Sequence, residues 1–186
     1  MAVTPTDEAA PESRPKVDPA KRKRSIIVLA SVAVAVVLLD QLSKAWVISS
    51  IKPRLGSGEG PIVLLGGLLK FTYVENTGAS FSIGTGYTWG FSIIAVVVVI
   101  VIIRTAGRLG SLWWAVALGG LLGGSIGNLI DRLSRPPGPG RGYVVDFIQL
   151  PNFAVFNVAD MAITGSAILM VLLALKGVDF TTGKSR

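Results

Sequence analysis

The sequence GGSIGNLIDR at residues 123–132 is followed by GYVVDFI at 142–148 and by FNVADMAI from 156 onward, and these three motifs organise the chain. They place Asp131, Asp146 and Asp160 among apolar residues. A charge beside membrane-grade hydrophobic sequence is costly and needs a reason. We therefore look for the chemistry of this chain around these carboxylates.

The composition indicates an integral membrane protein. Of 186 residues, 51% are hydrophobic and only 16% are charged, which is too apolar for an ordinary soluble domain. The sequence has no Cys and no His, so disulfides, thiol proteases and a Ser-His-Asp triad are excluded. Hydrolytic chemistry must use Asp, Glu, Lys or Ser, and we expect neither a metal nor another cofactor.

Four apolar segments predict four membrane-spanning helices, at about 25–47, 89–104, 112–131 and 156–176. We expect a disordered cytoplasmic tail at 1–24, a membrane domain at 25–176 and a second cytoplasmic tail at 177–186. With both termini inside, the main clusters of basic residues fall on one side, as the positive-inside rule requires. This distribution of the net charge of +7 favours a membrane and not a nucleic acid as partner. A cleavable signal peptide at 21–39 is the alternative for the first segment, but the hydrophobicity continues to residue 51.

The first outer loop predicts a small β-sheet. Short β-prone runs at 62–65 and 69–74 lie between Gly and Pro turn signals. The predicted fold class is an all-α membrane protein of four helices with a small extracytoplasmic β-sheet in this loop. The third span carries glycines spaced for close helix packing: Gly119, Gly120, Gly123, Gly124 and Gly127.

Helical rise brings four acidic residues to one level. From the basic residues at the inner ends of the first and last spans, an α-helix rises about 24 Å to Asp40 and to Asp160, and the hydrocarbon core is about 30 Å thick. Asp131 reaches the same level from the start of the third span. Asp146 lies in the loop that joins the third and fourth spans at that level. We expect the four carboxylates to converge near the outer boundary.

The spacing of the charged residues also fits purely structural roles. Asp40 and Lys44 are i,i+4 on a helix and fit a structural ion pair. Asn128, Asp131 and Arg132 share one helix face, and the last two fit a charge pair at a helix end.

Asn157 fits an N-cap of the fourth helix, whose dipole would favour an ionised Asp160, and it equally fits a substrate contact. Asp146 and Asp160 are harder to explain as ion pairs, because no basic residue lies between 143 and 175. Spacing alone leaves a paired-acid site and a structural role open.

In these motifs the sequence resembles the lipoprotein signal peptidase (signal peptidase II) family. The resemblance covers about 40–165 and rests on five motifs in order: DQLSK at 40–44, NTGASF at 76–81, GGSIGNLIDR at 123–132, VVDF at 144–147 and FNVAD at 156–160. Each motif alone is weak, but five in order are very specific. The chain departs from the family mainly in its long N-terminal tail and in the Pro/Gly-rich insert at 136–142.

The resemblance implies a four-span aspartic peptidase of the bacterial cell membrane, with its active site at the extracytoplasmic face. It implies cleavage of prolipoprotein signal peptides just before a diacylglyceryl-modified cysteine. The family's catalytic pair falls on Asp146 and Asp160. Its supporting polar residues match Asp40, Lys44, Asn76, Asn128, Asp131, Arg132 and Asn157. The expected partners are lipid-modified prolipoproteins and membrane lipids, and we expect a monomer.

The predicted mechanism uses one proton shared by two carboxylates. Two neighbouring aspartates cannot both ionise easily, so one is the base towards water and the other the acid towards the scissile peptide. Asp160, near a helix N-terminus, is the better candidate for the ionised member. We expect the 48–88 loop, with Asn76 and Phe81, to close over the scissile bond.

Other classes of function remain open from the sequence. Intramembrane acids also mark transport or proton-relay paths, although here they cluster at one face. A small assembly factor would use the glycine face to bind partner helices. A presenilin-type protease is a further enzyme class, but its Gly-x-Gly-Asp signature is absent because Tyr143 follows Gly142.

Overall fold

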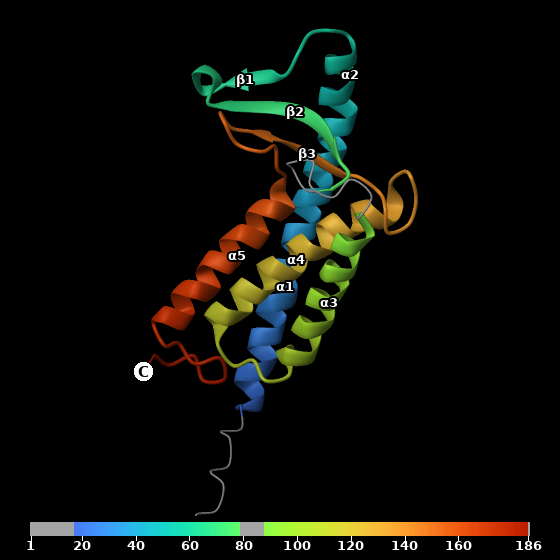
Figure 1. Cartoon of the computed structure of the whole chain (residues 1–186). Coiled ribbons are helices and arrows are strands. Elements are labelled where there is room, and N and C mark those ends of the chain that lie inside the picture. The colour runs from blue at the N-terminus through green and yellow to red at the C-terminus, as the bar shows by residue number, and fades with distance from the viewer. Residues whose placement is uncertain (1–16, 79–87, 186) are drawn as a thin grey trace, which may run out of the picture.

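The computed structural model describes residues 17–78 and 88–185. In this part of the chain, four helices are long and apolar enough to cross a membrane, and a three-stranded antiparallel sheet lies at one end of the bundle (Figure 1). The start of the first helix and the C-terminus lie at the opposite end. The predicted class, a four-helix membrane protein with a small β-sheet, is confirmed.

The membrane helices follow the four apolar segments closely. They are α1 (Pro19–Trp46), α3 (Thr88–Ala106), α4 (Leu112–Ser134) and α5 (Val158–Leu175). Beyond α1 the chain continues as a π-helical segment, η1 (Val47–Ile51), and a short helix, α2 (Lys52–Gly56). The first helix is thus longer than predicted and projects past the bundle towards the sheet (Figure 1).

Helix α1 also begins earlier than predicted. The Asp18 side chain caps it by accepting the Ala20 N–H at 2.9 Å, and Pro19 occupies the first turn, where its missing N–H costs nothing. Residues 19–24, expected in the disordered tail, are therefore the first turns of α1. Residues 1–16 of that tail, and Phe81 of the outer loop, lie outside the described residues.

The sheet predicted in the first outer loop is present, and the second outer loop adds a third strand that the sequence analysis did not predict. Strands β1 (Ile62–Leu64) and β2 (Leu69–Asn76) come from that loop, but β3 (Val144–Gln149) comes from the second. The order is β1-β2-β3, and β3 pairs antiparallel with β2. The run VVDFI is rich in residues that favour strands, and pairing with β2 satisfies its backbone groups. The segment predicted as a loop around Asp146 is consequently a strand.

A small apolar cluster joins the sheet to the end of α1. Val47 and Ile51 of η1 are fully buried against Val145 and Phe147 of β3. The π-helical turn lies directly above Lys44 and places these two side chains on the sheet. The position of β3 relative to α1 is therefore fixed by packing as well as by strand pairing.

Helix α4 is the centre of the bundle and packs against α1, α3 and α5. A Cβ atom at Gly123 would lie 2.6 Å from the carbonyl oxygen of Ala33 in α1, and one at Gly124 would lie 2.6 Å from that of Ala159 in α5. Real Cβ atoms do not approach a carbonyl so closely, so only glycine allows these helices to meet. The predicted role of the glycines is confirmed on two faces of α4.

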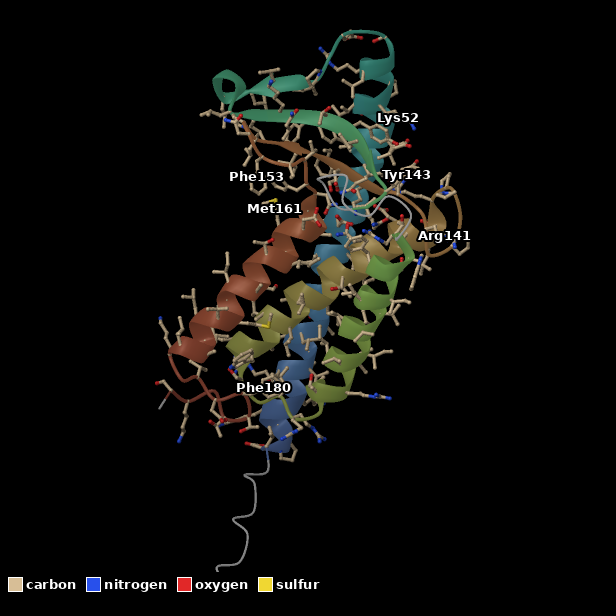
Figure 2. All side chains as sticks on the ribbon, in the orientation of Figure 1. Lys52, Arg141, Tyr143, Phe153, Met161 and Phe180 are labelled. Carbon is tan, nitrogen blue, oxygen red and sulfur yellow. The ribbon has the colours of Figure 1, made fainter. Side chains whose placement is uncertain are left out.

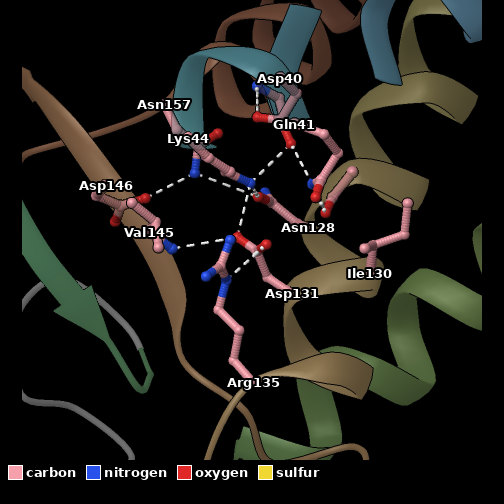
Figure 3. A network of polar contacts seen from close by, with 12 residues as sticks. Asp40, Gln41, Lys44, Asn128, Ile130, Asp131, Arg135, Val145, Asp146 and Asn157 are labelled. Carbon is pink, nitrogen blue, oxygen red and sulfur yellow. Dashed lines mark hydrogen bonds and ion pairs between the residues drawn. The ribbon is translucent and has the colours of Figure 1, made fainter. Parts of the chain in front are cut away.

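A buried ion network ties the same helices together (Figure 3). Lys44 Nζ lies 2.8 Å from Asp40 Oδ2 and 2.9 Å from Asp131 Oδ2, and all three side chains are fully buried. Asp40 Oδ1 also accepts the backbone N–H of Ala159, at the start of α5, at 3.0 Å. One cluster thus connects α1, α4 and α5, and the predicted Asp40–Lys44 pair is confirmed.

The predicted Asp131–Arg132 charge pair is wrong. Asp131 pairs with Lys44 and with Arg135, whose Nε lies 2.9 Å from Asp131 Oδ1. Successive residues of an α-helix point about 100° apart, so Asp131 faces α1 while Arg132 faces a different direction.

The expected C-terminal tail is folded. The Phe180 carbonyl accepts the N–H groups of Gly110 and Ser111, and Trp114 Nε1 donates to the Val178 carbonyl at 2.9 Å. Phe180 also packs edge-on against Trp114, at the end of the bundle away from the sheet (Figure 2). Residues 178–185 therefore anchor the start of α4 instead of forming a free tail.

Replacing Gly124 by alanine tests the close approach of α4 and α5. The new methyl would meet Ala159 O at 2.6 Å and Ile163 Cγ1 at 2.8 Å, and such overpacking costs about 1–3 kcal/mol. We expect Gly124→Ala to lower the thermal unfolding midpoint in detergent. Gly90→Ala in α3, where nothing lies within 4 Å, is the matched control and should not lower it. Equal midpoints for the two variants would contradict this packing.

Replacing Lys44 by methionine tests the buried ion network. It would leave Asp40 and Asp131 without their shared cation, and breaking a buried pair costs about 3–5 kcal/mol. The control is Lys52→Met, which removes the Lys52–Glu75 pair, whose side chains are 48% and 43% exposed; we expect a loss of about 0–1 kcal/mol. Denaturant titration of both variants gives the two losses, and comparable values would show that the buried network is not a main source of stability.

Candidate active site

The polar site lies where α1, α4 and α5 meet the sheet. All the predicted site residues except Arg132 belong to one connected network, and Figure 3 shows the part of it around Lys44, Asn128 and Asp131. They come from the end of α1, the last turns of α4, strands β2 and β3 and the first turn of α5. The expected convergence of four carboxylates is confirmed.

Asp160 is positioned by the start of α5. Asn157 is the N-cap, and its side chain accepts the Asp160 N–H at 2.9 Å. In return Asp160 Oδ2 accepts the Asn157 N–H at 3.1 Å, which completes a capping box. The predicted cap is confirmed, and it places the Asp160 carboxylate in the positive field of the helix N-terminus.

Asp146 is positioned by strand pairing. It lies in β3 opposite Val74 of β2, and its side chain is almost fully buried. Its two carboxylate oxygens accept hydrogen bonds from Asn157 Nδ2 at 2.6 Å and from Asn76 Nδ2 at 2.7 Å. Burial raises the pKa of Asp146 to about 7, and the nearby Asp160 charge acts in the same direction, against the opposing effect of the two amide donors. Asp146 can therefore hold a proton near neutral pH.

Three asparagine amides are oriented so that their NH2 groups face the two aspartates. The side-chain oxygen of Asn76 accepts the Gly78 N–H at 3.1 Å, and that of Asn157 accepts the Asp160 N–H. Backbone N–H groups can only donate, so each amide must turn its nitrogen the other way, towards Asp146.

Asn128 is oriented by a charge. Its Oδ1 accepts from Lys44 Nζ at 3.1 Å and from Asn157 Nδ2 at 3.2 Å, and its Nδ2 donates to Asp160 Oδ1 at 2.8 Å. An ammonium group has no acceptor, so Lys44 dictates which end of the Asn128 amide faces Asp160. The buried ion network thus reaches the aspartate pair through one neutral side chain.

A hollow of about 670 Å³ opens beside this network, between α3 and α5. Asp160, Asn76 and Arg132 contribute its polar lining, and Phe91, Phe153 and Met161 contribute apolar side chains. Its volume suits a substrate segment with apolar groups. Asp160 and Asn76, whose amide donates to Asp146, therefore line the same hollow.

Arg132 adds a cation to the wall of this hollow. It is 9% exposed, its guanidinium lies 5.6 Å from the centre of the Phe91 ring, and its buried Nε has no hydrogen-bond partner among the described residues. The Arg132 side chain lines the hollow, whereas those of Asn128 and Asp131 belong to the polar network. Arg132 therefore contributes a positive charge to the lining of the hollow.

The structure also adds residues that the sequence prediction did not include. Arg135 holds Asp131, and Gln41 Nε2 donates to Asp40 Oδ2 at 3.0 Å and to the Gly127 carbonyl at 3.1 Å. The i,i+4 spacing of Asp131 and Arg135 in the sequence could have predicted the pairing of these two residues. The aromatic residues of the hollow gave no sequence signal beyond their apolar character.

The insert at 136–142 shapes the segment before Asp146 by closing the end of α4. The N–H groups of Gly140 and Gly142 both donate to the Arg132 carbonyl, and Ser92 Oγ of α3 donates to the Gly140 carbonyl at 2.8 Å. A Cβ at Gly142 would lie within 3.0 Å of three carbonyl oxygens of α4. The insert is therefore packed against α3 and α4 before the chain enters β3.

Comparisons with known proteins agree with this geometry. A family model described as signal peptidase (SPase) II matches residues 32–176. The lipoprotein signal peptidase of Mycobacterium avium (strain 104) is 44% identical over 182 residues, which is 98% of this chain and 93% of the relative. That of Streptomyces griseus is 48% identical over 163 residues, covering 88% and 81%.

A solved structure described as a bacterial membrane enzyme is similar over 94% of this chain and 99% of its own, with a TM-score of 0.68 and 27% identity. The family match covers most of the chain and includes every predicted site residue. The resemblance inferred from the five motifs is confirmed. This chain belongs to the signal peptidase II family.

Proposed function

We propose that this protein is a membrane aspartic endopeptidase that removes the signal peptide from bacterial prolipoproteins. The observation that carries the proposal is that Asn157 contacts both Asp146 and Asp160, beside a hollow that Asp160 lines. The relatives named lipoprotein signal peptidase support the same activity and do not favour transport or proton relay. No residue of the site requires a cofactor for this chemistry.

The two aspartates take different parts in the proposed reaction. Asp160 is the proposed ionised member, because it lies in the first turn of α5 and accepts one N–H bond at each oxygen. Asp146 carries the proton, because its burial raises its pKa to about 7. Asp160 takes a proton from the attacking water, while Asp146 donates towards the scissile carbonyl or the leaving amine.

The hollow between α3 and α5 would receive the substrate. Its apolar lining fits a signal segment or acyl chains that remain partly in lipid, and Arg132 can donate to a carbonyl oxygen near the scissile bond. Cleavage just before a diacylglyceryl-modified cysteine is the corresponding substrate specificity. Asn76 would hold Asp146 and contact the substrate from the sheet side.

The proposed orientation has both termini in the cytoplasm and the sheet outside. The basic residues of 21–24, 104–108 and 176–184 lie at the end of the bundle opposite the sheet (Figure 1), as the positive-inside rule predicts for the cytoplasmic side. The site would then face the extracytoplasmic surface. We propose that the enzyme acts as a monomer in contact with membrane lipid.

Replacing either aspartate by asparagine tests the proposed pair. Asp146→Asn and Asp160→Asn each remove one proton-transfer group, and we expect turnover of a diacylglyceryl-modified preprolipoprotein to fall at least 10²–10⁴-fold, in the order-of-magnitude range of general acid–base catalysis. The control is Glu59→Gln, which changes a 56% exposed side chain paired with Arg54. This control should leave turnover unchanged. All three variants should keep the wild-type fold, which their thermal unfolding midpoints would check. Wild-type turnover in one aspartate variant would remove that residue from the mechanism, and equal cleavage of the unmodified precursor would remove the lipid from substrate recognition.

The pH dependence of turnover tests which aspartate holds the proton. As the pH rises through about 7, the pKa of Asp146, that residue loses its proton, so kcat/KM should fall about tenfold per pH unit well above this value. The Asn76 hydrogen bond stabilises the ionised form and lowers the pKa of Asp146. Asn76→Ala removes it, so the basic limb of the profile should move to higher pH. A limb that stays in place or moves to lower pH would assign the proton to another group.

A further inference from the structure

A second hollow lies on the other side of the turn that walls the active site. It has a volume of about 370 Å³ and is lined by Gly67 and Lys70, from the β1–β2 side of the sheet, by Gln149 at the end of β3 and by residues 150–153 after it. Leu150 and Phe153 line both this hollow and the one at the active site. The 150–153 turn is therefore a shared wall, and we call the second cavity the sheet hollow.

The polar side chains of the sheet hollow have no partners of their own. Lys70 is half-buried, and among the described residues no carboxylate lies within ion-pair distance of its ammonium group. Gln149 and Asn152 line the same hollow, and their side chains make no hydrogen bond within the described part of the chain. A cation and two amides thus converge on one space without satisfying one another, which is the donor set that a phosphate oxygen accepts from.

This arrangement distinguishes Lys70 from nearby cations. On the same side of the molecule, Lys52 pairs with Glu75 and Arg54 pairs with Glu59. Neither lines the sheet hollow. Lys70 is available for an anion from outside the chain, whereas these two already have carboxylate partners.

Exposed apolar residues either line the sheet hollow, as Phe153 does, or lie close to its lining residue Gly67 in the sequence, as Leu65 and Leu68 do, and we call these three its apolar rim. Leu65 is 73% exposed, Leu68 63% and Phe153 64%. Leu65 adopts φ 50°, a left-handed conformation that leucine rarely adopts. Asn152, in the opposite turn, adopts φ 56°, which asparagine tolerates better. Two turns with left-handed residues therefore carry exposed apolar side chains close in sequence to residues that line the sheet hollow.

The apolar rim is continuous with the lipid-facing surface of α5. Phe153 lies near the N-terminal end of α5, close to Met161, which is 55% exposed (Figure 2). Ile168 and Leu172 extend this exposed apolar surface along the helix. A molecule with its polar end at Lys70 can consequently lay an acyl chain along a membrane-spanning helix.

From these features we infer that the sheet hollow binds the phosphate headgroup of a membrane phospholipid. Lys70 contacts the phosphate, Gln149 and Asn152 donate to its oxygens, and Phe153 packs against the acyl region. The polar residues of this site, Lys70, Gln149 and Asn152, do not line the active-site hollow, and the proposed ligand differs from the substrate's diacylglyceryl group because that group carries no phosphate. Because Phe153 and Leu150 line both spaces, the bound lipid also supports the wall against which the proposed substrate lies.

Lipid binding to the purified full-length protein in neutral detergent tests this inference. The probes are phosphatidylglycerol, diacylglycerol with the same acyl chains, and inorganic phosphate, with bound lipid counted by native mass spectrometry and stability followed by the thermal unfolding midpoint. We expect phosphatidylglycerol to bind and raise the midpoint. Diacylglycerol and inorganic phosphate should have little effect, since each lacks one half of the recognised group.

The variants compare two lysines on the same side of the molecule. Lys70→Gln should weaken phosphatidylglycerol binding about tenfold, the usual scale for one charged contact, whereas Lys52→Gln should bind as the wild type does. Unchanged binding in Lys70→Gln, or equal losses in both variants, would overturn the inference. Equally tight binding of diacylglycerol would show that the hollow recognises only the acyl chains. Because these readouts do not involve peptide cleavage, they stand or fall independently of the proposed peptidase activity.

Discussion

A lysine ammonium group without solvent contact is the constraint on which the rest of the structure depends. Moving an ammonium ion out of water costs several kcal/mol even after relaxation, so Lys44 must keep its two carboxylates close. Asp40 and Asp131 belong to different helices, and Asp40 also accepts an N–H at the start of α5. The mutual height of three spans is therefore set by one charge cluster, while the glycines of α4 remove the steric barrier to that arrangement.

The charge of Lys44 also determines the direction of hydrogen bonds in the site. Lys44 does not touch the proposed catalytic aspartates through a hydrogen bond, but it fixes the orientation of Asn128, which does. The side-chain amides of Asn76, Asn128 and Asn157 donate hydrogen bonds to Asp146 and Asp160. The oxygen of each amide accepts from a group that can only donate, which fixes the orientation of the amide. Among the described residues no lysine or arginine forms an ion pair with Asp146 or Asp160, so the proposed sharing of one proton would depend on neutral donors.

Local features of the sequence predict much of the fold and of the candidate site. Hydropathy predicts the four spans, the i,i+4 spacing of Asp40 and Lys44 predicts their pair, and the position of Asn157 before an apolar run predicts its cap. Helical rise even places the acids at one level. These predictions succeed because each depends on residues within one helix or on the thickness of the membrane.

The parts that the sequence did not predict depend on contacts between distant segments. The run VVDFI reads equally well as a loop or a strand until β2 lies beside it, and Asp131 has a basic neighbour in sequence but pairs across to α1. The folded C-terminal segment rests on backbone bonds to Gly110 and Ser111, which leave no pattern in hydropathy. The two turns around the sheet hollow likewise become a site only once β1, β2 and the segment after β3 are assembled.

The pairing of β2 with β3 has a consequence for biogenesis. Asn76 and Asp146 are 70 positions apart, yet Asp146 acquires its amide donor and its burial only when the two strands meet. Strand β2 precedes the second span, whereas β3 follows the third, so a partly inserted chain holds an aspartate that water still surrounds. Such a nascent chain would have no competent proton donor, and proteolytic capacity would arise only in the last stage of assembly, after both connecting segments had crossed to the same side.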